Sequence, residues 1–366
     1  MGSITRSFAN LITANGPSAV ADGSVTTADI SGKINFKNII INGDMSIAQR
    51  GTSESGIGVT GGTYLLDRFE FVNVGPLETW TMSQDTDVPT GRGFTNSMKF
   101  DCTTADASPA ADDVLILRQI IEGQNLQYLK KGTANAESLT ASFWVKSSKT
   151  GTYIAELYDT DNTRTISKSY TIDASDTWEK KTLTFAGDTT GAFNNDSNAS
   201  LYLDFWLGSG STYTSGTLQT SWGAYSATDR AVGQVNLADS TANEWFITGV
   251  QLEAGTTASD FEFLPYDISF DRCQRYYRRI QYRYAPTIRY TDGGGSGKAH
   301  NWIPLSPEMR TTPSFTVVSF TSTSGFTGDL VVVGVDQSSL VTKATNASGV
   351  NVCLYANGQA TLDAEL

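Results

Sequence analysis

The chain has 366 residues and a formal net charge of −12. This length is sufficient for an extensive hydrophobic core and for two or three domains. The charge argues against a general nucleic-acid-binding protein, because affinity for phosphate depends on clustered Lys and Arg. The sequence has no signal-peptide pattern and no run of about 18 apolar residues, so we expect no membrane insertion and folding in a cytoplasm. The abundance of Thr, Ser, Gly, Asn, Asp and aromatic residues predicts an all-β fold.

The first 35 residues mix small polar residues with isolated apolar ones and have neither helical nor strand periodicity. Such a segment cannot bury enough apolar surface to fold by itself. We therefore predict that residues 1–35 form an attachment arm, either disordered or ordered only against a partner.

Strand patterns follow from Ile39 to Phe263, separated by polar turns. In the stretch SLTASFWVKS (residues 138–147) apolar residues recur with a period of two, which places Phe143 and Trp144 on opposite faces of one strand. The stretch SLYLDFWLG (residues 200–208) has the same pattern. Residues 152–172 indicate two strands joined by a turn at residues 159–162. About ten such strands predict a jelly-roll β-sandwich over residues 36–266.

A single helical pattern follows the strands. Asp267 or Ser269 can cap a helix in which apolar residues recur at helical spacing. This stripe needs a surface to cover, and its members are Phe270, Cys273, Tyr277 and Ile280. We predict a linking helix over residues 267–284. Six arginines between residues 272 and 289 could contact phosphate or anionic sugar, but we interpret them as an exposed face that pairs with carboxylates.

After Pro286 the sequence again indicates strands and loops, including a glycine-rich tip at residues 292–297. Residues 285–366 are therefore predicted to form a smaller, C-terminal β domain of ordinary domain size.

The sequence contains no complete motif for a metal site or a nucleotide-binding site. The three cysteines (Cys102, Cys273 and Cys353) lie far apart without zinc spacing, so we expect reduced, mostly buried thiols and no metal or cofactor. With one histidine, His300, a multi-histidine metal site is excluded, and we expect an exposed loop residue. The stretch around Asp292 departs from a phosphate loop, and the DTDNT stretch at Asp159 lacks the glycine and glutamate of a calcium loop.

Several motifs occur in an order that resembles a family of bacteriophage tail-fibre proteins, which is similar to carbohydrate-binding jelly rolls. The resemblance covers Asn38 to Leu366, and the motifs are NIIINGDMSIAQRGTS, YLLDRFEF, TWEKKTLTF, ITGVQLEAG, CQRYY, EMRTTPSF and the terminal DAEL.

This resemblance implies a structural protein of the virion tail, assembled in the host cytoplasm as a homotrimer. Residues 1–35 would attach to a tail adaptor or nozzle protein, and the helix stripe would pack near the threefold axis as an oligomer interface. A capsid decoration or head-fibre protein is the alternative. No collagen-like or heptad repeat indicates a long shaft.

Sugar binding has a physical motive, because aromatic faces stack on pyranose rings while neighbouring polar groups bond the hydroxyls. The first candidate is the long polar loop after residue 208, with Trp206, Tyr213, Trp222 and Tyr225 on or beside it. The alternative is that Trp206 packs under the loop and Trp222 anchors it. The second candidate is a C-terminal loop with Tyr290, Asp292, His300 and Trp302, for which a solvated turn is the alternative.

The predicted ligand is a host surface polysaccharide or lipopolysaccharide. We expect no enzymatic activity, because no carboxylate pair stands out and no solenoid repeat of the kind found in phage depolymerases is visible. A polysaccharide depolymerase is the less favoured hypothesis.

Overall fold

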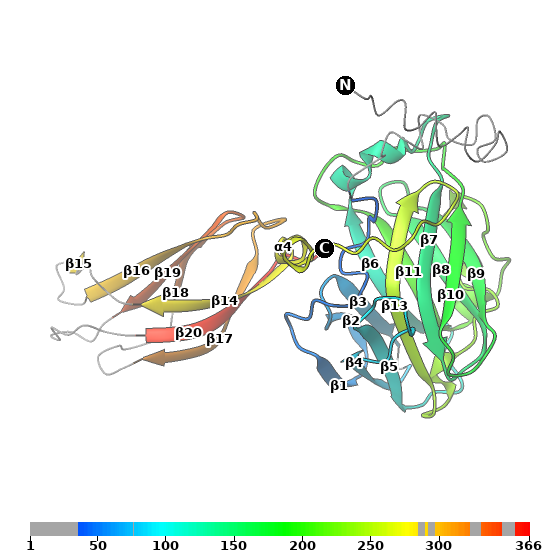
Figure 1. Ribbon diagram of the computed structural model, residues 1–366, viewed down its shortest axis with the longest axis horizontal. Coiled ribbons are helices and arrows are strands. Elements are labelled where there is room, and N and C mark those ends of the chain that lie inside the picture. Colours follow the sequence, from blue (N-terminus) through cyan, green and yellow to red (C-terminus); the bar gives the residue numbers. More distant parts are fainter. Residues whose placement is uncertain (1–35, 76, 285–289, 292–296, 323–330, 346–355) are drawn as a thin grey trace, which may run out of the picture. The chain divides into compact units, whose positions relative to one another are not determined.

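Two antiparallel sheets face each other in the larger part of the molecule (Figure 1). The computed structural model describes residues 36–366 except 76, 285–289, 292–296, 323–330 and 346–355, so the predicted arm at residues 1–35 lies outside the described residues. The first sheet has six strands in the order β1-β4-β5-β13-β7-β10. Their bounds are β1 Ser53–Ile57, β4 Thr79–Asp85, β5 Ser97–Thr104, β7 Leu139–Ser147, β10 Glu179–Phe185 and β13 Glu244–Ala254.

The second sheet has seven strands in the order β12-β9-β8-β11-β6-β3-β2. The turn predicted at residues 159–162 joins β8 to β9, which pair in register from Gly151↔Ile172 to Asp159↔Arg164. The strands are β2 Thr60–Tyr64, β3 Phe69–Val74, β6 Val114–Glu122, β8 Gly151–Asp159, β9 Arg164–Ile172, β11 Ala199–Ser209 and β12 Gly223–Ala224. Short helical segments in the connections are η1 Gly123–Asn125, η2 Gln127–Leu129, α3 Ser211–Thr214, η3 Ala227–Asp229 and η4 Leu237–Asp239.

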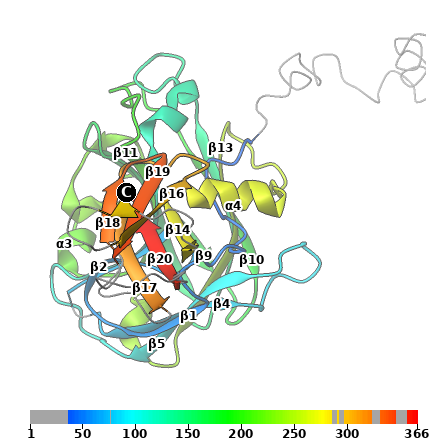
Figure 2. The same ribbon diagram turned by 90° about the vertical axis from the view of Figure 1, so that its left-hand side faces the viewer.

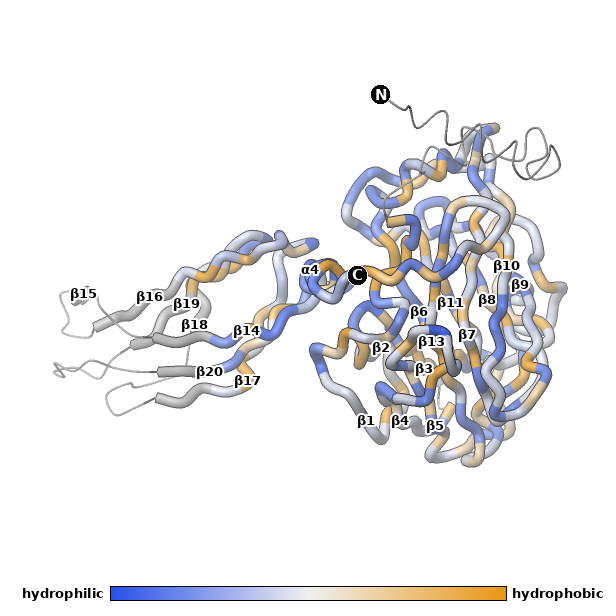
Figure 3. Tube along the Cα trace, viewed as in Figure 1, coloured by the Kyte–Doolittle hydropathy of each residue, from blue (hydrophilic) through white to orange (hydrophobic). Residues whose placement is uncertain are grey.

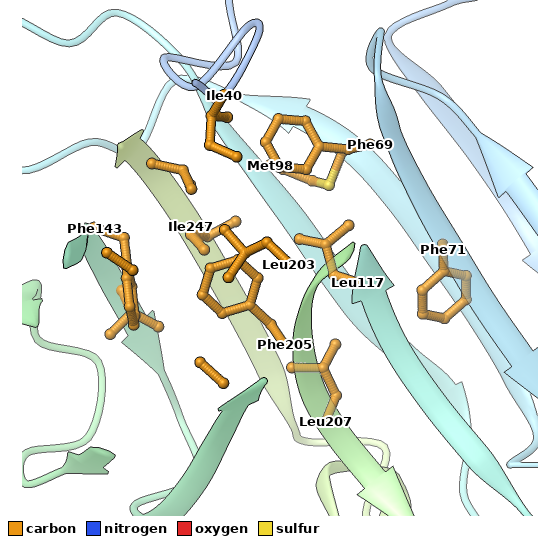
Figure 4. Close-up of a cluster of buried hydrophobic side chains, with 14 of the residues drawn as sticks. Ile40, Phe69, Phe71, Met98, Leu117, Phe143, Leu203, Phe205, Leu207 and Ile247 are labelled. Atoms are coloured by element: carbon orange, nitrogen blue, oxygen red, sulfur yellow. The ribbon is translucent and has the colours of Figure 1, made fainter. Parts of the chain in front are cut away.

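The core lies between these two sheets. Figure 4 shows Ile247 and Phe143 from the six-stranded sheet pointing toward Leu203 and Phe205 from the other sheet. Each such apolar side chain contributes about 1.5–3 kcal/mol when it leaves water. Apolar and polar segments alternate along the strands (Figure 3), because successive residues of a strand point to opposite faces. The predicted all-β sandwich is therefore confirmed.

Helix α4 (Tyr266–Gln274), yellow in Figure 2, follows the sandwich. The helix predicted over residues 267–284 is too long, because Tyr277–Tyr284 form strand β14 instead. Strand β14 pairs with β20 along its whole length, from Tyr277↔Asp363 to Tyr284↔Ala356. This pairing joins residues about 80 positions apart, and the local helical spacing of the apolar residues did not indicate it. None of the helices among the described residues is long and apolar enough to cross a membrane.

The C-terminal strands form two small sheets, with the orders β14-β20-β17 and β15-β16-β19-β18. A separate apolar cluster that includes Leu305, Met309, Leu340 and Leu362 fills this region. The further strands are β15 Tyr290–Thr291, β16 Gly297–Pro304, β17 Ser314–Ser322, β18 Val331–Val335, β19 Ser339–Thr345 and β20 Ala356–Asp363. The strands predicted after Pro286 are thus present in the described residues.

Charged side chains connect the residues after the sandwich to the sandwich itself. Buried Glu122 on β6 accepts hydrogen bonds from Arg275 at 2.9 and 2.8 Å and from the Tyr276 hydroxyl. Burial opposes ionisation of Glu122, but these hydrogen bonds outweigh it and lower its pKa. Buried Arg68 forms an ion pair with Glu365 near the C-terminus.

Candidate functional site

An open groove of about 510 Å³ lies on the outer face of the six-stranded sheet. We call it the Trp144 groove. It is formed by three strands of the sheet and by two connecting segments, and its lining residues are Gly91, Arg92, Phe94, Ser142, Trp144, Lys180, Gly249, Asp260, Phe261 and Phe263.

The floor of the groove is set by strand register. Trp144 on β7 is opposite Thr248 on β13 and Lys180 on β10, so these three side chains share the outer face. Phe143, the preceding residue, points into the core and is fully buried. A half-buried tryptophan is thereby held on a rigid strand.

Three phenylalanines form an aromatic wall. The ring centroids of Phe94, Phe261 and Phe263 lie 4.9–5.1 Å apart, and the Phe263 side chain is 51% exposed. Phe94 packs directly over the backbone of Gly249, which has φ +62° and lies at an irregularity in the pairing of β13 with β7. A Cβ at Gly249 would be only 2.5 Å from the Phe94 ring, so this wall requires glycine.

Buried polar side chains of β13 hold the segment that carries Asp260 and Phe261. The Gln251 side chain is fully buried, donates to Ser259 Oγ at 3.1 Å and accepts from the Glu262 amide at 2.9 Å. Glu253 accepts from the amide and hydroxyl of Ser259 at 2.8 and 2.7 Å. These bonds fix a loop against a strand, which gives the groove a preformed wall.

Cationic groups lie beside Trp144. The Arg92 guanidinium carbon lies 5.1 Å from the centre of the Trp144 ring, within the range of a cation–π interaction. The Arg92 and Lys180 side chains are exposed, and Asp260 is the carboxylate that lines the groove.

The same outer face continues as a charged and aromatic strip. Lys146 forms an ion pair with Asp87, and its Nζ lies 4.0 Å from the centre of the Phe246 ring. The Trp178 indole donates to Asp87 at 2.8 Å. Burial opposes ionisation of Asp87, but hydrogen bonds from Lys146 and Trp178 outweigh it and lower the pKa. These groups satisfy one another, whereas among the described residues Arg92 and Lys180 of the groove form no ion pair with a carboxylate.

The four aromatic residues predicted on or beside the long loop differ in how far they are buried. Trp206 is fully buried, and its indole donates to Glu156 at 3.1 Å, so the alternative in which it packs beneath the loop is correct and its role as a sugar platform is wrong. Tyr213 packs against it with ring centroids 5.4 Å apart. Trp222 is half-buried and donates to the Ala186 carbonyl at 2.7 Å, which anchors the loop. Tyr225 is 37% exposed and stays a predicted glycan-binding residue.

Beneath that loop, charged side chains cross the seven-stranded sheet in one register row. Arg118 binds Asp204 at 2.7 and 2.9 Å, and Arg230 binds Glu156 at 2.7–3.0 Å. Burial raises the pKa of Glu70, the row's member on β3, to about 7, although Arg118 opposes this. The charged side chains of this row form ion pairs with one another, so we interpret the row as stabilising the sheet.

The remaining predicted residues lie after the sandwich. Trp302 on β16 is 63% exposed, whereas Tyr290 lies in β15 and its side chain is outside the described residues. Asp292 is also outside the described residues. His300 and Trp302 lie in strand β16, so the prediction that they belong to a loop is wrong.

The predicted interface stripe is not one surface. Cys273 is fully buried against Ile41, Ile47 and Tyr276 of the same chain, with half-buried Phe270 beside it. Tyr277 and Ile280 lie in β14, as described above. The stripe as predicted from helical spacing is therefore wrong. Cys102 and Cys273 are buried free thiols, as expected, and Cys353 is outside the described residues.

Sequence reasoning missed the Trp144 groove, although one signal was present. The alternation in residues 138–147 places a tryptophan on the polar face of a strand, which is an unusual position for a large ring without a partner. Residues 91–94 and 260–263 carry no motif of their own. Within the described residues no group of three or more His, Cys, Asp or Glu side chains is arranged to hold a metal ion.

Comparisons with known proteins leave the family open. No protein-family model and no curated protein match the chain, so the tail-fibre family stays a prediction from the motifs.

Solved structures give distant similarities. The enzymatically active domain of bacteriophage CBA120 tailspike protein 4 is 14% identical over 60% of this chain and 22% of that chain, with a TM-score of 0.29. The family 11 carbohydrate-binding module of a Clostridium thermocellum cellulosomal cellulase is 10% identical over 56% of this chain and 96% of that chain, with a TM-score of 0.25. TmCBM61 in complex with β-1,4-galactotriose is 11% identical over 59% and 98%, with a TM-score of 0.24. Because these TM-scores are low, the fold assignment rests on the sheets described above and not on these similarities.

Proposed function

We propose that the Trp144 groove binds a saccharide, and that the chain is a tail-fibre subunit of a bacteriophage that attaches to a host surface glycan without cleaving it. The observation that carries the binding proposal is the groove itself. It combines an aromatic wall, in which Phe263 is exposed, with a tryptophan, a serine and charged groups on a rigid sheet. Aromatic faces with converging polar groups are suited to pyranose rings, which have apolar C–H faces and hydroxyl edges.

The tail-fibre part of the proposal is supported by the order of the sequence motifs. In a homotrimer attached through residues 1–35 to a tail adaptor or nozzle protein, three copies of the groove would act together. When geometry permits simultaneous engagement, multivalency raises avidity by orders of magnitude, so each groove needs only weak affinity. The proposal that the chain is not an enzyme is tested by incubating host polysaccharide with it, because unchanged polymer size is expected and new reducing ends would contradict it.

The binding test compares three aromatic substitutions, one for each candidate surface. Trp144→Ala changes the groove, Tyr225→Ala changes the long loop, and Trp302→Ala changes the C-terminal sheet. Binding of each variant to surface polysaccharide from the host is measured by titration calorimetry, with circular dichroism to confirm folding. We expect Trp144→Ala to lose binding and Trp302→Ala to retain it. Loss only in Tyr225→Ala or Trp302→Ala would move the site away from the groove.

Location in the virion has its own test. Immunogold electron microscopy with antibody against residues 286–366 should label the tail. Gold over the capsid would instead support the alternative of a decoration or head-fibre protein. Sedimentation of the purified chain should give a trimer, and a monomer at micromolar concentration would contradict that part of the proposal.

A further inference from the structure

The Trp144 groove has a charge that differs in sign from the molecule around it. The whole chain carries a net charge of −12. The ionisable residues that line the groove are Arg92, Lys180 and Asp260, two cations against one carboxylate, which gives a local excess of one positive charge.

Neighbouring cations on the same face are committed to carboxylates. Lys146 pairs with Asp87, and Lys99 pairs with Glu244 at 2.7 Å. In the described part of the chain, by contrast, no ion pair joins Arg92 or Lys180 to a carboxylate, and their side chains are exposed. A groove cation that is not paired with a carboxylate is available to an anionic ligand.

The two cations flank the aromatic platform. Lys180 lies directly across the β7–β10 pair from Trp144, and the Arg92 guanidinium lies 5.1 Å from the Trp144 ring centre. A sugar placed against Trp144 would therefore present its ring substituents to both charges. A planar guanidinium also matches the geometry of a carboxylate or phosphate and can donate two hydrogen bonds to it.

From this arrangement we infer that the Trp144 groove selects acidic saccharides, in which a carboxylate or phosphate substituent is bound by Arg92 and Lys180 while the sugar ring packs on Trp144. This inference rests on the proposed function of the groove. A uronic acid and a phosphorylated sugar share the chemistry that these two cations recognise, and the experiment below distinguishes them.

The test uses an array of bacterial surface polysaccharides, each printed in native form, after carboxyl reduction with carbodiimide and borohydride, and after dephosphorylation with hydrofluoric acid. The full chain is applied at low and high salt. We expect signal from native acidic polymers, loss of that signal after removal of the acidic group, and weaker binding at high salt, because exposed ionic contacts are screened. Loss on carboxyl reduction identifies a carboxylate, such as that of a uronic acid, and loss on dephosphorylation identifies a phosphate.

Substitutions assign the effect to the two cations. Arg92→Gln and Lys180→Gln should each weaken binding to acidic polymers by about ten-fold, the scale of one charge-assisted contact. Lys130→Gln is the matched control, since Lys130 is an exposed lysine outside the groove, paired with Glu137.

The outcomes separate this inference from the proposed function. Neutral and carboxyl-reduced polymers that bind as tightly as native acidic ones, with Trp144→Ala still abolishing binding, would overturn the inference and leave the proposed function intact. Arg92→Gln and Lys180→Gln variants that bind like Lys130→Gln would also overturn it. Absence of binding to every polymer on the array would overturn both.

Discussion

The position of Gly249 allows a quantitative test of how the aromatic wall is built. In Gly249→Ala the new Cβ would lie 2.5 Å from Cζ of Phe94 and 3.0 and 3.2 Å from the two Cε atoms, so the ring must move. The residue also has φ +62°, which an alanine adopts at a cost of about 1–2 kcal/mol. Overpacking of this kind costs a further 1–3 kcal/mol or so. Gly249→Ala should therefore destabilise the sandwich by roughly 2–5 kcal/mol.

Gly233→Ala provides the matched control, because Gly233 has φ +87° and, apart from its two chain neighbours, no residue has an atom within 4 Å of the position of its Cβ. It should cost about 1–2 kcal/mol, the backbone contribution alone. Stability is measured by guanidinium denaturation followed by tryptophan fluorescence, which reports on the sandwich because every tryptophan except Trp302 lies there. Equal losses in the two variants would show that Phe94 is not held against Gly249. The double variant Gly249→Ala/Phe94→Leu should recover part of the difference.

Three further changes test other parts of the structure. Burial raises the pKa of Glu70 from 4.5 to about 7, so folding favours the protonated form of this side chain. The resulting contribution to the free energy of unfolding, about 3 kcal/mol, is present below pH 4.5 and is lost as the pH rises through 7. Glu70→Gln should flatten that decline in denaturation experiments between pH 4.5 and 8, and an unchanged slope would contradict the assignment. Arg275→Ala leaves Glu122 buried with fewer partners and should cost about 3 kcal/mol, measured by denaturation, with faster proteolysis after residue 275. If Arg275→Ala has wild-type stability, that ion pair is not formed in solution. Trp206→Ala should cost about 3–5 kcal/mol by creating a cavity, whereas a stable, folded variant with reduced glycan binding would restore Trp206 as a binding residue.

Local periodicity predicted much of the sandwich. The alternation in residues 138–147 correctly placed Phe143 and Trp144 on opposite faces of the strand, because a strand exposes successive residues to opposite faces. The same alternation in residues 200–208 places Phe205 and Trp206 on opposite faces of their strand, which is also correct. It could not show that residues 211–231 fold back over the face of Trp206 and bury the ring, since this depends on contacts distant in sequence.

The length of the helix was predicted wrongly and the groove was not predicted, both because they depend on contacts between residues distant in sequence. Phe270 and Cys273 do lie in a helix, but Tyr277 leaves it because β14 has a partner strand near the C-terminus. The groove unites residues 91–94, 142–144 and 260–263, whose proximity arises from sheet register and from buried hydrogen bonds of Gln251. Single-sequence patterns contain neither kind of information.

The most direct test of the account is hydrogen–deuterium exchange of the full chain with and without surface polysaccharide from the host. We predict that the polysaccharide slows amide exchange in residues 91–94 and 260–263, the two segments that form the walls of the Trp144 groove. Slowed exchange confined to residues 211–230, or to β16, with residues 91–94 and 260–263 unchanged, would contradict the assignment of the groove as the glycan-binding site.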